Sequence, residues 1–76
     1  MVIAYVMVKA STGEADRLRE AIAACDGVDE VHIVAGDVDL IAKASVSSPA
    51  AVKDLVTGCI QAVDGVADTN TYIAMA

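Results

Sequence analysis

The spacing of apolar residues along the chain predicts four strands separated by two helices. Four segments are rich in β-branched residues and are bounded by turn formers, which is typical of strands. Two intervening segments carry apolar residues at steps of three and four, as amphipathic helices do. The predicted strands are Val2–Lys9, Val28–Ala35, Leu40–Val46 and Val66–Met75.

The first predicted helix begins near Ser11 and ends at Asp26-Gly27. The segment Ser11-Thr12-Gly13-Glu14 has the spacing of a capping box, in which the Ser11 hydroxyl accepts from the amide of Glu14 and the Glu14 side chain reaches back. A helix that begins here would expose its charged residues and bury one stripe of apolar residues along its length. That stripe consists of Ala15, Leu18, Ile22 and Cys25.

The second predicted helix begins at Ser48-Pro49 and ends at Asp64-Gly65. Ser48 is a favourable N-cap, and Pro49 suits the first helical position because its missing amide costs no helical hydrogen bond there. Two of its apolar positions, Val52 and Cys59, match Leu18 and Cys25 of the first helix in spacing. The full stripe is Val52, Leu55, Val56, Cys59, Ile60 and Val63.

The order of the elements is strand, helix, strand, strand, helix, strand. With right-handed crossovers, this order predicts an α+β, ferredoxin-like βαββαβ fold, in which two helices cover one face of a four-stranded antiparallel sheet. The first strand is apolar on both sides, with Val2, Ala4, Val6 and Val8 on one and Ile3, Tyr5 and Met7 on the other. Because each buried Val or Ile contributes roughly 1.5 to 3 kcal/mol, we expect a second sheet to cover the helix-free face in a homodimer.

Charge and cysteine content narrow the functional classes. Eleven acidic and five scattered basic residues give a net charge of -6, so we predict no direct binding to nucleic acid. The longest apolar run, Met1–Val8, is too short to cross a bilayer and lacks the basic flank of a signal peptide; we expect a cytoplasmic protein. Cys25 and Cys59 are expected to be thiols there, with a redox bridge between them as the alternative.

The tetrad Gly36-Asp37-Val38-Asp39 is the candidate ligand site. Glycine supplies positive φ and an amide without a covering side chain, while two carboxylates flank a valine. A free amino acid, which carries both a carboxylate and an ammonium, would find a donor and an acceptor there. The alternatives are a plain hairpin turn, or a divalent cation held by Asp37 and Asp39 with Asp29 or Glu30, although no spacing matches a known metal loop.

Several segments in order make the chain resemble the effector-binding domain of the Lrp/AsnC family of transcription regulators. They are Ala4-Tyr5-Val6-Met7-Val8-Lys9, Asp26-Gly27-Val28, Gly36-Asp37-Val38-Asp39-Leu40, Asp64-Gly65-Val66 and Thr69-Asn70-Thr71. The resemblance implies a single ligand-binding and oligomerisation domain over residues 1–76, a homo-oligomer built from dimers, and an amino acid as effector. An enzyme on the same fold, acylphosphatase-like or a monooxygenase, is an alternative, but the single histidine and the lack of tryptophan weigh against it.

The same resemblance implies roles for individual residues. Gly36 and its neighbouring amides would hold the ligand carboxylate, and Asp39 would accept from the ammonium. Thr69 and Thr71 would contribute hydroxyls from a neighbouring subunit. Asp37 stands at a variable position of the motif, and Val38 replaces an aromatic residue that is common there.

Because the chain begins directly in its first strand, it resembles the form of the domain without a helix-turn-helix. Regulation would then run through sensing, or through mixed assembly with a DNA-binding paralogue. Two other binding functions stay open, a ligand-free assembly module and an ACT-like amino-acid sensor with its site near Ser11–Gly13. The only histidine, His32, has no residue at the spacing of a triad or a ligand set, so we predict no catalytic residue, no metal and no cofactor.

Overall fold

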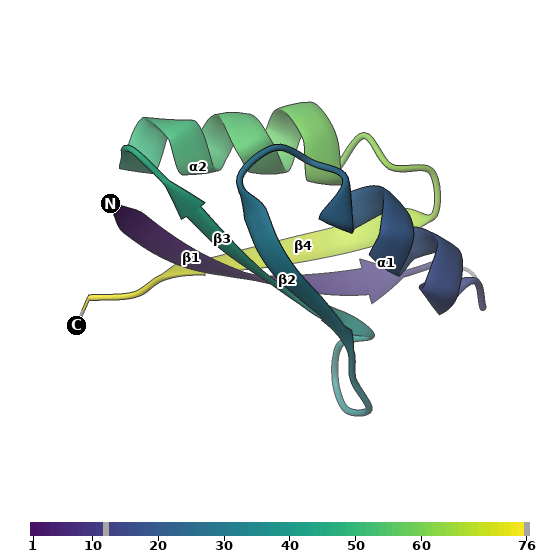
Figure 1. Cartoon of the computed structure of the whole chain (residues 1–76). Helices are drawn as coiled ribbons and strands as arrows, with labels where there is room; N and C mark the ends of the chain where they lie inside the picture. Colours follow the sequence, from purple (N-terminus) through teal and green to yellow (C-terminus); the bar gives the residue numbers. More distant parts are fainter. Residues whose placement is uncertain (12, 76) are drawn as a thin grey trace.

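The computed structural model describes residues 1–11 and 13–75 and contains the predicted order of elements (Figure 1). Only the ends of the elements differ from the prediction, and the second helix changes its winding halfway. The strands are β1 (Val2–Ala10), β2 (Val28–Ile33), β3 (Leu40–Val46) and β4 (Val66–Ile73). The helices are α1 (Ala15–Ala23) and α2 (Pro49–Leu55), and α2 continues into a π-helical segment, η1 (Val56–Ile60).

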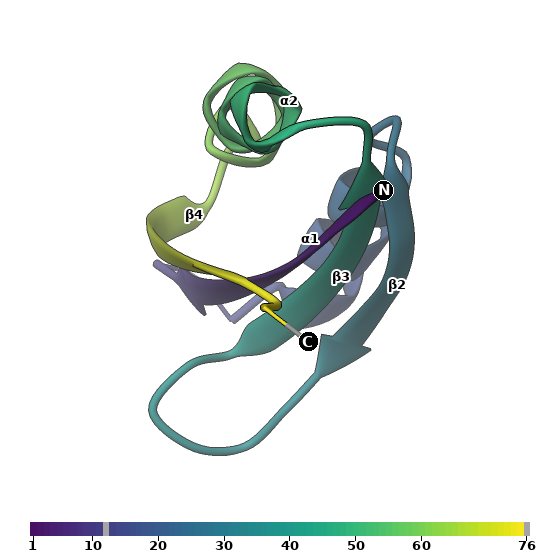
Figure 2. The ribbon, with the colours of Figure 1, turned by 90° about the vertical axis from the view of Figure 1, so that its left-hand side faces the viewer.

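The four strands form one antiparallel sheet in the order β2-β3-β1-β4. Both helices lie on the same side of this curved sheet (Figures 1 and 2). The ferredoxin-like βαββαβ prediction is therefore confirmed. Because β1 lies between β3 and β4, its two faces decide what is core and what is surface.

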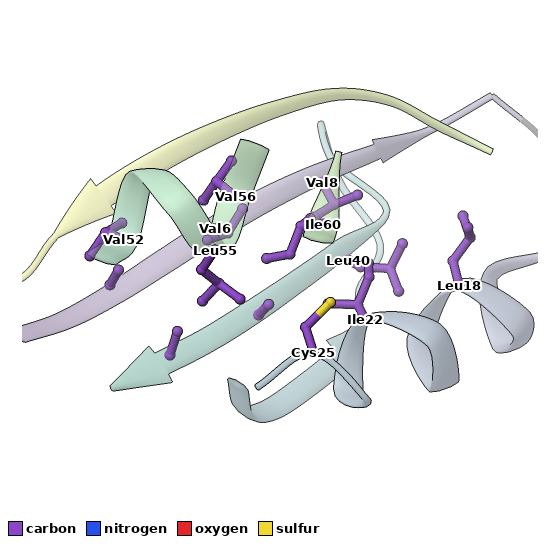
Figure 3. Packing of buried hydrophobic residues seen from close by; sticks show 13 residues of the cluster. Val6, Val8, Leu18, Ile22, Cys25, Leu40, Val52, Leu55, Val56 and Ile60 are labelled. Carbon is purple, nitrogen blue, oxygen red and sulfur yellow. The ribbon is translucent and has the colours of Figure 1, made fainter. Parts of the chain in front are cut away.

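The core lies between the helices and one face of β1. Ala4, Val6 and Val8 are fully buried on this face, as alternation along a strand requires. Figure 3 shows how the side chains of the two helices pack together over the sheet. The helix residues of this core are Leu18, Ile22, Val52, Leu55, Val56 and Ile60. With Cys25, which is also in the core, these residues make up most of the predicted apolar stripes; Cys59 and Val63 are partly buried at the margin, and Ala15 lies outside the core cluster.

The prediction for the start of the first helix is wrong. The helix begins at Ala15 with Glu14 in the N-cap position. Ser11 instead bonds to Gly65, the residue before β4: its amide and its hydroxyl both donate to the Gly65 carbonyl, at 2.8 and 3.2 Å. Thr12, the second residue of the predicted capping box, lies outside the described residues.

The N-cap of the second helix is confirmed. The Ser48 Oγ accepts from the amide of Ala51 at 3.2 Å, and Pro49 occupies the first turn. Two strands end earlier than predicted, β2 at Ile33 and β4 at Ile73. As a result, the connection between β2 and β3 is an irregular loop rather than a tight turn.

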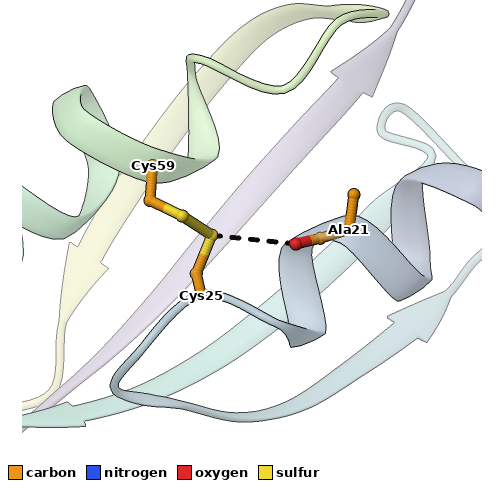
Figure 4. Close-up of a disulfide and its surroundings, with 3 residues drawn as sticks. All are labelled: Ala21, Cys25 and Cys59. Atoms are coloured by element: carbon orange, nitrogen blue, oxygen red, sulfur yellow. Dashed lines mark hydrogen bonds between the residues drawn. A yellow bond between two sulfur atoms is a disulfide. The ribbon is translucent and has the colours of Figure 1, made fainter.

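Cys25 and Cys59 form a disulfide, so the prediction of separate thiols is wrong (Figure 4). The two Cα atoms are 6.0 Å apart. Cys25 follows the C-terminal end of α1, and Cys59 belongs to η1, whose helical segment lies beside α1 in Figure 4. Equivalent positions on the two apolar stripes thus face each other, which brings the sulfur atoms together.

Candidate functional site

The loop 34–39 projects from the sheet on the side away from α2 (Figures 1 and 2). Gly36 has a φ of 156°, and a Cβ added there would meet no atom within 4 Å. The loop is closed by a hydrogen bond from the amide of Val34 to the carbonyl of Asp39 at 2.9 Å. The tetrad is therefore an exposed loop held at its base.

Asp39 ties this loop to β1. Its amide donates to the Val8 carbonyl at 2.9 Å, and its Oδ2 accepts from the amide of Ala10 at 2.8 Å. The register of β1 against β4 shifts between Lys9 and Ala10, so the Ala10 amide lies at an irregularity of the ladder. The Asp39 carboxylate, predicted to bind the ligand ammonium, thus has a structural partner within the chain.

The loop and the sheet together line a hollow of about 230 Å³, hereafter the loop pocket. Asp37 and Val38 come from the loop. Two cross-strand pairs of β1 and β4, Met7 opposite Asn70 and Lys9 opposite Asp68, form most of the rest, and Thr69 lies between the two β4 residues. The full lining is Met7, Lys9, Asp37, Val38, Asp68, Thr69 and Asn70.

The loop pocket contains side chains of both charges. Lys9 contributes an ammonium, while Asp37 and Asp68 contribute carboxylates. Met7 and Val38 add apolar surface between them. A larger groove of about 680 Å³ lies elsewhere, beside Cys59, and its charged lining residues are the acidic Asp26 and Asp54. The loop pocket combines the predicted loop with groups complementary to both ends of an amino acid.

Thr69 and Thr71 share one face of β4, as their spacing predicts. They pair with Val8 and Val6 of β1, whose side chains are buried under the helices. The Thr69 hydroxyl accepts from Gln61 Nε2 at 2.8 Å on that side. The threonine hydroxyls therefore lie on the opposite side of the sheet from Lys9 and Met7.

The structure brings together some of the six predicted site residues and separates others. Asp37 and Val38 line the loop pocket, Gly36 and Asp39 belong to the same loop, Thr69 borders the pocket with its hydroxyl turned to the other side of the sheet, and Thr71 lies apart. The sequence analysis missed Lys9, Asp68, Met7 and Asn70. Their positions in the sequence could have indicated this. Met7 and Lys9 are two residues apart on one strand, and Asp68 and Asn70 are two apart on another, so each pair lies on one face of its strand. Once the two strands are known to be neighbours, the two pairs can be placed side by side.

The helix-free face of the sheet carries the predicted apolar residues of β1, together with polar and charged residues from the other three strands. Tyr5 and Tyr72 are cross-strand neighbours and are 37% and 55% exposed. The remaining apolar residues of this face are Ile3, Met7 and Ile41. At its β2 margin, Glu30 Oε1 lies 3.2 Å from His32 Nε2, and Glu30 Oε2 lies 3.8 Å from Lys43 Nζ.

Two of the acids considered for a cation site have other partners. Asp29 Oδ2 accepts from the Ser45 hydroxyl at 2.5 Å, and Glu30 pairs with His32 and Lys43. Within residues 1–11 and 13–75, no group of three or more His, Cys, Asp or Glu side chains is arranged to hold a metal ion. No helix in this described part of the chain is both long and apolar enough to span a membrane.

Comparison with known families and structures agrees with this architecture. The family model of the Lrp/AsnC ligand binding domain matches residues 3–76. The leucine-responsive regulatory protein of Haemophilus influenzae is 28% identical over 75 residues. That alignment covers 99% of this chain and 45% of the relative, so the chain spans less than half the length of that protein.

Solved structures share the whole fold. A protein from Thermus thermophilus is 33% identical, with a TM-score of 0.94 over 100% of this chain and 95% of its own. Escherichia coli AsnC is 18% identical, with a TM-score of 0.91 over 99% of this chain and 51% of its own. At that identity the likeness shows the fold alone. The family match over nearly the full length shows that this chain belongs to the Lrp/AsnC ligand-binding domain family of transcription regulators.

Proposed function

We propose that this chain is a non-enzymatic sensor that binds a free amino acid in the loop pocket and works as an oligomer. The observation that carries the proposal is the combination of Lys9, Asp37 and Asp68 around one hollow beside the Gly36 loop. A zwitterion needs one cationic and one anionic partner, and charge-assisted hydrogen bonds to both are stronger than neutral ones.

In this proposal, Lys9 and the amides near Gly36 bind the ligand carboxylate, and Asp37 with Asp68 binds the ammonium. Asp39 holds the loop against β1 and adds negative charge nearby. Met7 and Val38 favour an apolar ligand side chain. The volume of about 230 Å³ is below the range of about 300–1,000 Å³ found for drug-sized ligands, so a small effector fits best.

One structural neighbour supports an amino acid as the ligand class. A transcriptional regulator from Neisseria meningitidis, solved as a complex with L-Met, has a TM-score of 0.86 and is 16% identical. At this identity the neighbour shows only that the same fold holds an amino acid in that protein. The chemistry of the pocket in this chain has to carry the rest of the proposal.

Oligomerisation would occur through the helix-free face. An exposed aromatic pair, Tyr5 and Tyr72, bordered by apolar and polar residues, is typical of an interaction surface. The loop pocket opens at the rim of this face, so a second subunit would shield it from water and strengthen its charge interactions. Thr71, on the other side of the sheet, could reach a ligand only in the site of another subunit.

Transcription control would run through a partner, because the net charge of -6 opposes binding of this chain to the phosphate backbone of DNA. The partner would be a paralogue that carries a DNA-binding domain, joined in a mixed assembly in the cytoplasm. Co-purification of such a paralogue with the tagged chain, with and without amino acids, tests this part. Recovery of no DNA-binding paralogue under either condition would contradict it.

Calorimetric titration of the twenty amino acids tests the ligand site. We expect heat from at least one of them, and about tenfold or greater weakening in Lys9→Gln because a charged hydrogen bond contributes about 1.5–3 kcal/mol. Lys53→Gln, on the exposed face of α2, is the matched control and should bind as the unaltered protein does. Unchanged affinity in Lys9→Gln would overturn the assignment of the loop pocket.

A further inference from the structure

We propose that the Cys25–Cys59 disulfide is a site of thiol–disulfide exchange, at which a dithiol enters the groove beside α2 and attacks the sulfur of Cys59. This inference is independent of the proposed ligand site. It rests on the unequal surroundings of the two sulfur atoms, on the groove that reaches only one of them, and on the charge of that groove.

Access distinguishes the two cysteines. Cys25 is 4% exposed and belongs to the hydrophobic core, whereas Cys59 is only partly buried. Cys59 also lines the groove of about 680 Å³, and Cys25 is not among its lining residues. Exchange requires a thiolate to reach a sulfur along the line of the S–S bond, so access decides which sulfur is attacked. The groove therefore selects Cys59 as the attacked atom and Cys25 as the leaving one.

The groove is formed by three parts of the fold that meet around Cys59. They are the turn after α1, the end of β3, and one side of α2 with η1. Its residues are Asp26, Gly27, Ser45, Val46, Ser47, Ala51, Asp54, Leu55, Gly58 and Cys59. Gly58 contributes to this accessibility, because a Cβ added there would meet no atom within 4 Å. A larger side chain at position 58 would therefore extend into the groove beside Cys59.

A partner for the leaving sulfur is already in place. Cys25 Sγ lies 3.8 Å from the carbonyl oxygen of Ala21, along the dashed line in Figure 4. A sulfur in a disulfide has no proton to donate, so in the oxidised protein this is a contact only. After reduction, the Cys25 thiol can donate to this carbonyl, one helical turn back. The buried product thiol would therefore be satisfied without rearrangement of α1.

The exchange has two balanced steps. In the first, a thiolate of the dithiol forms a bond to Cys59 Sγ, the Cys25–Cys59 bond breaks, and the Cys25 thiolate takes a proton from water. In the second, the other thiol of the dithiol loses its proton and attacks the mixed disulfide, which releases Cys59 as a thiolate that is then protonated. The protein gains two electrons and two protons, and the dithiol becomes a disulfide.

The charge of the groove defines the class of dithiol. Its charged lining residues, Asp26 and Asp54, are both acidic. The attacking thiolate is itself negative. The acidic groove therefore repels a dithiol whose own molecule carries further negative charge near the thiols, and favours one whose neighbouring groups are neutral or positive. A cytoplasmic location would place the disulfide where such dithiols keep cysteines reduced and where disulfides are usually transient or sensory.

Variants with one cysteine test the difference in access. Cys25→Ser leaves only the Cys59 thiol, and Cys59→Ser leaves only the Cys25 thiol. With the neutral reagent dithiodipyridine, and with folding checked by circular dichroism, we expect Cys59 to react about tenfold faster or more. Equal rates in two folded variants, or faster reaction of Cys25, would overturn the proposal.

The unaltered disulfide gives a second test that does not depend on those variants. Dithiothreitol reduction, followed by acid quenching, alkylation and mass spectrometry, should be slowed about fivefold or more by Gly58→Leu, which fills the approach. Gly13→Leu is the matched control, because a Cβ there also meets no atom within 4 Å and Gly13 does not line the groove. Equal rates in the two leucine variants would contradict entry through the groove.

The charge of the attacking thiol is tested with two reagents. The ratio of reduction rates by cysteamine and by mercaptoethanesulfonate should exceed the ratio expected from their thiol pKa values. It should fall by about twofold or more in the Asp26→Asn/Asp54→Asn variant and in high salt. A ratio that neither substitution nor salt changes would refute the predicted preference for neutral or positive surroundings.

Discussion

Reduction of the Cys25–Cys59 bond should lower the free energy of unfolding by about 4 kcal/mol. The cross-link joins residues separated by 34 positions and encloses β2, β3 and α2. In the chain-entropy account, closing a loop of this length in the unfolded chain removes conformational freedom equivalent to about 4 kcal/mol at 25 °C. Since domains are typically stable by about 5–15 kcal/mol, this is a large share.

Urea unfolding followed by far-ultraviolet circular dichroism measures this loss. The oxidised protein, the protein reduced with a phosphine, and the Cys25→Ala/Cys59→Ala variant are compared at one protein concentration, because association also shifts apparent stability. Both altered forms should lose about 3–4 kcal/mol, the double variant slightly more because its alanines leave space in the core. A loss below about 1 kcal/mol in both would refute the argument that the cross-link restrains the unfolded chain.

Three further substitutions test local interactions by the same unfolding measurement. Ser48→Ala should lose about 1 kcal/mol because it removes the N-cap of α2, while Ser47→Ala should change stability by less than about 0.5 kcal/mol; equal losses would contradict the cap. Asp39→Ala should lower the free energy of unfolding by about 1 kcal/mol, because the hydrogen bond of its carboxylate to β1 is lost, whereas Asp37→Ala should not. A larger loss in Asp37→Ala than in Asp39→Ala would contradict the role of Asp39 in holding the loop against β1. Ile22→Val should lose about 0.5–1.5 kcal/mol, and no loss would contradict its packing in the core.

Local patterns were sufficient to predict the order of elements and most of the core. Each apolar stripe depends only on spacing within its own segment, so Leu18 and Ile60 could be assigned to the core without knowledge of the rest. The same holds for Ser48, whose hydrogen-bond partner is three residues away. The prediction that Ser11 caps the first helix was wrong for the opposite reason. The group to which Ser11 bonds, the Gly65 carbonyl, is 54 positions away along the chain.

The disulfide and the site depended on contacts between distant segments. The equivalent positions of Cys25 and Cys59 were visible in the sequence, but the distance between them follows only from how α1 and η1 lie on the sheet. Similarly, the loop at Gly36 could be located, whereas Lys9 and Asp68 become part of the pocket through the pairing of β1 with β4. The change from α- to π-helical winding at Val56 had no recognisable signal.

Titration calorimetry on the assembled and the monomeric protein tests the central claim, that an amino acid binds a pocket completed by assembly. Tyr5→Asp places a charge at the centre of the helix-free face and should give a folded monomer by sedimentation velocity and circular dichroism. We predict that the assembled protein binds at least one amino acid and that the folded monomer loses this binding. No heat from any of the twenty amino acids in the assembled protein, or full affinity in the monomer, would contradict the account.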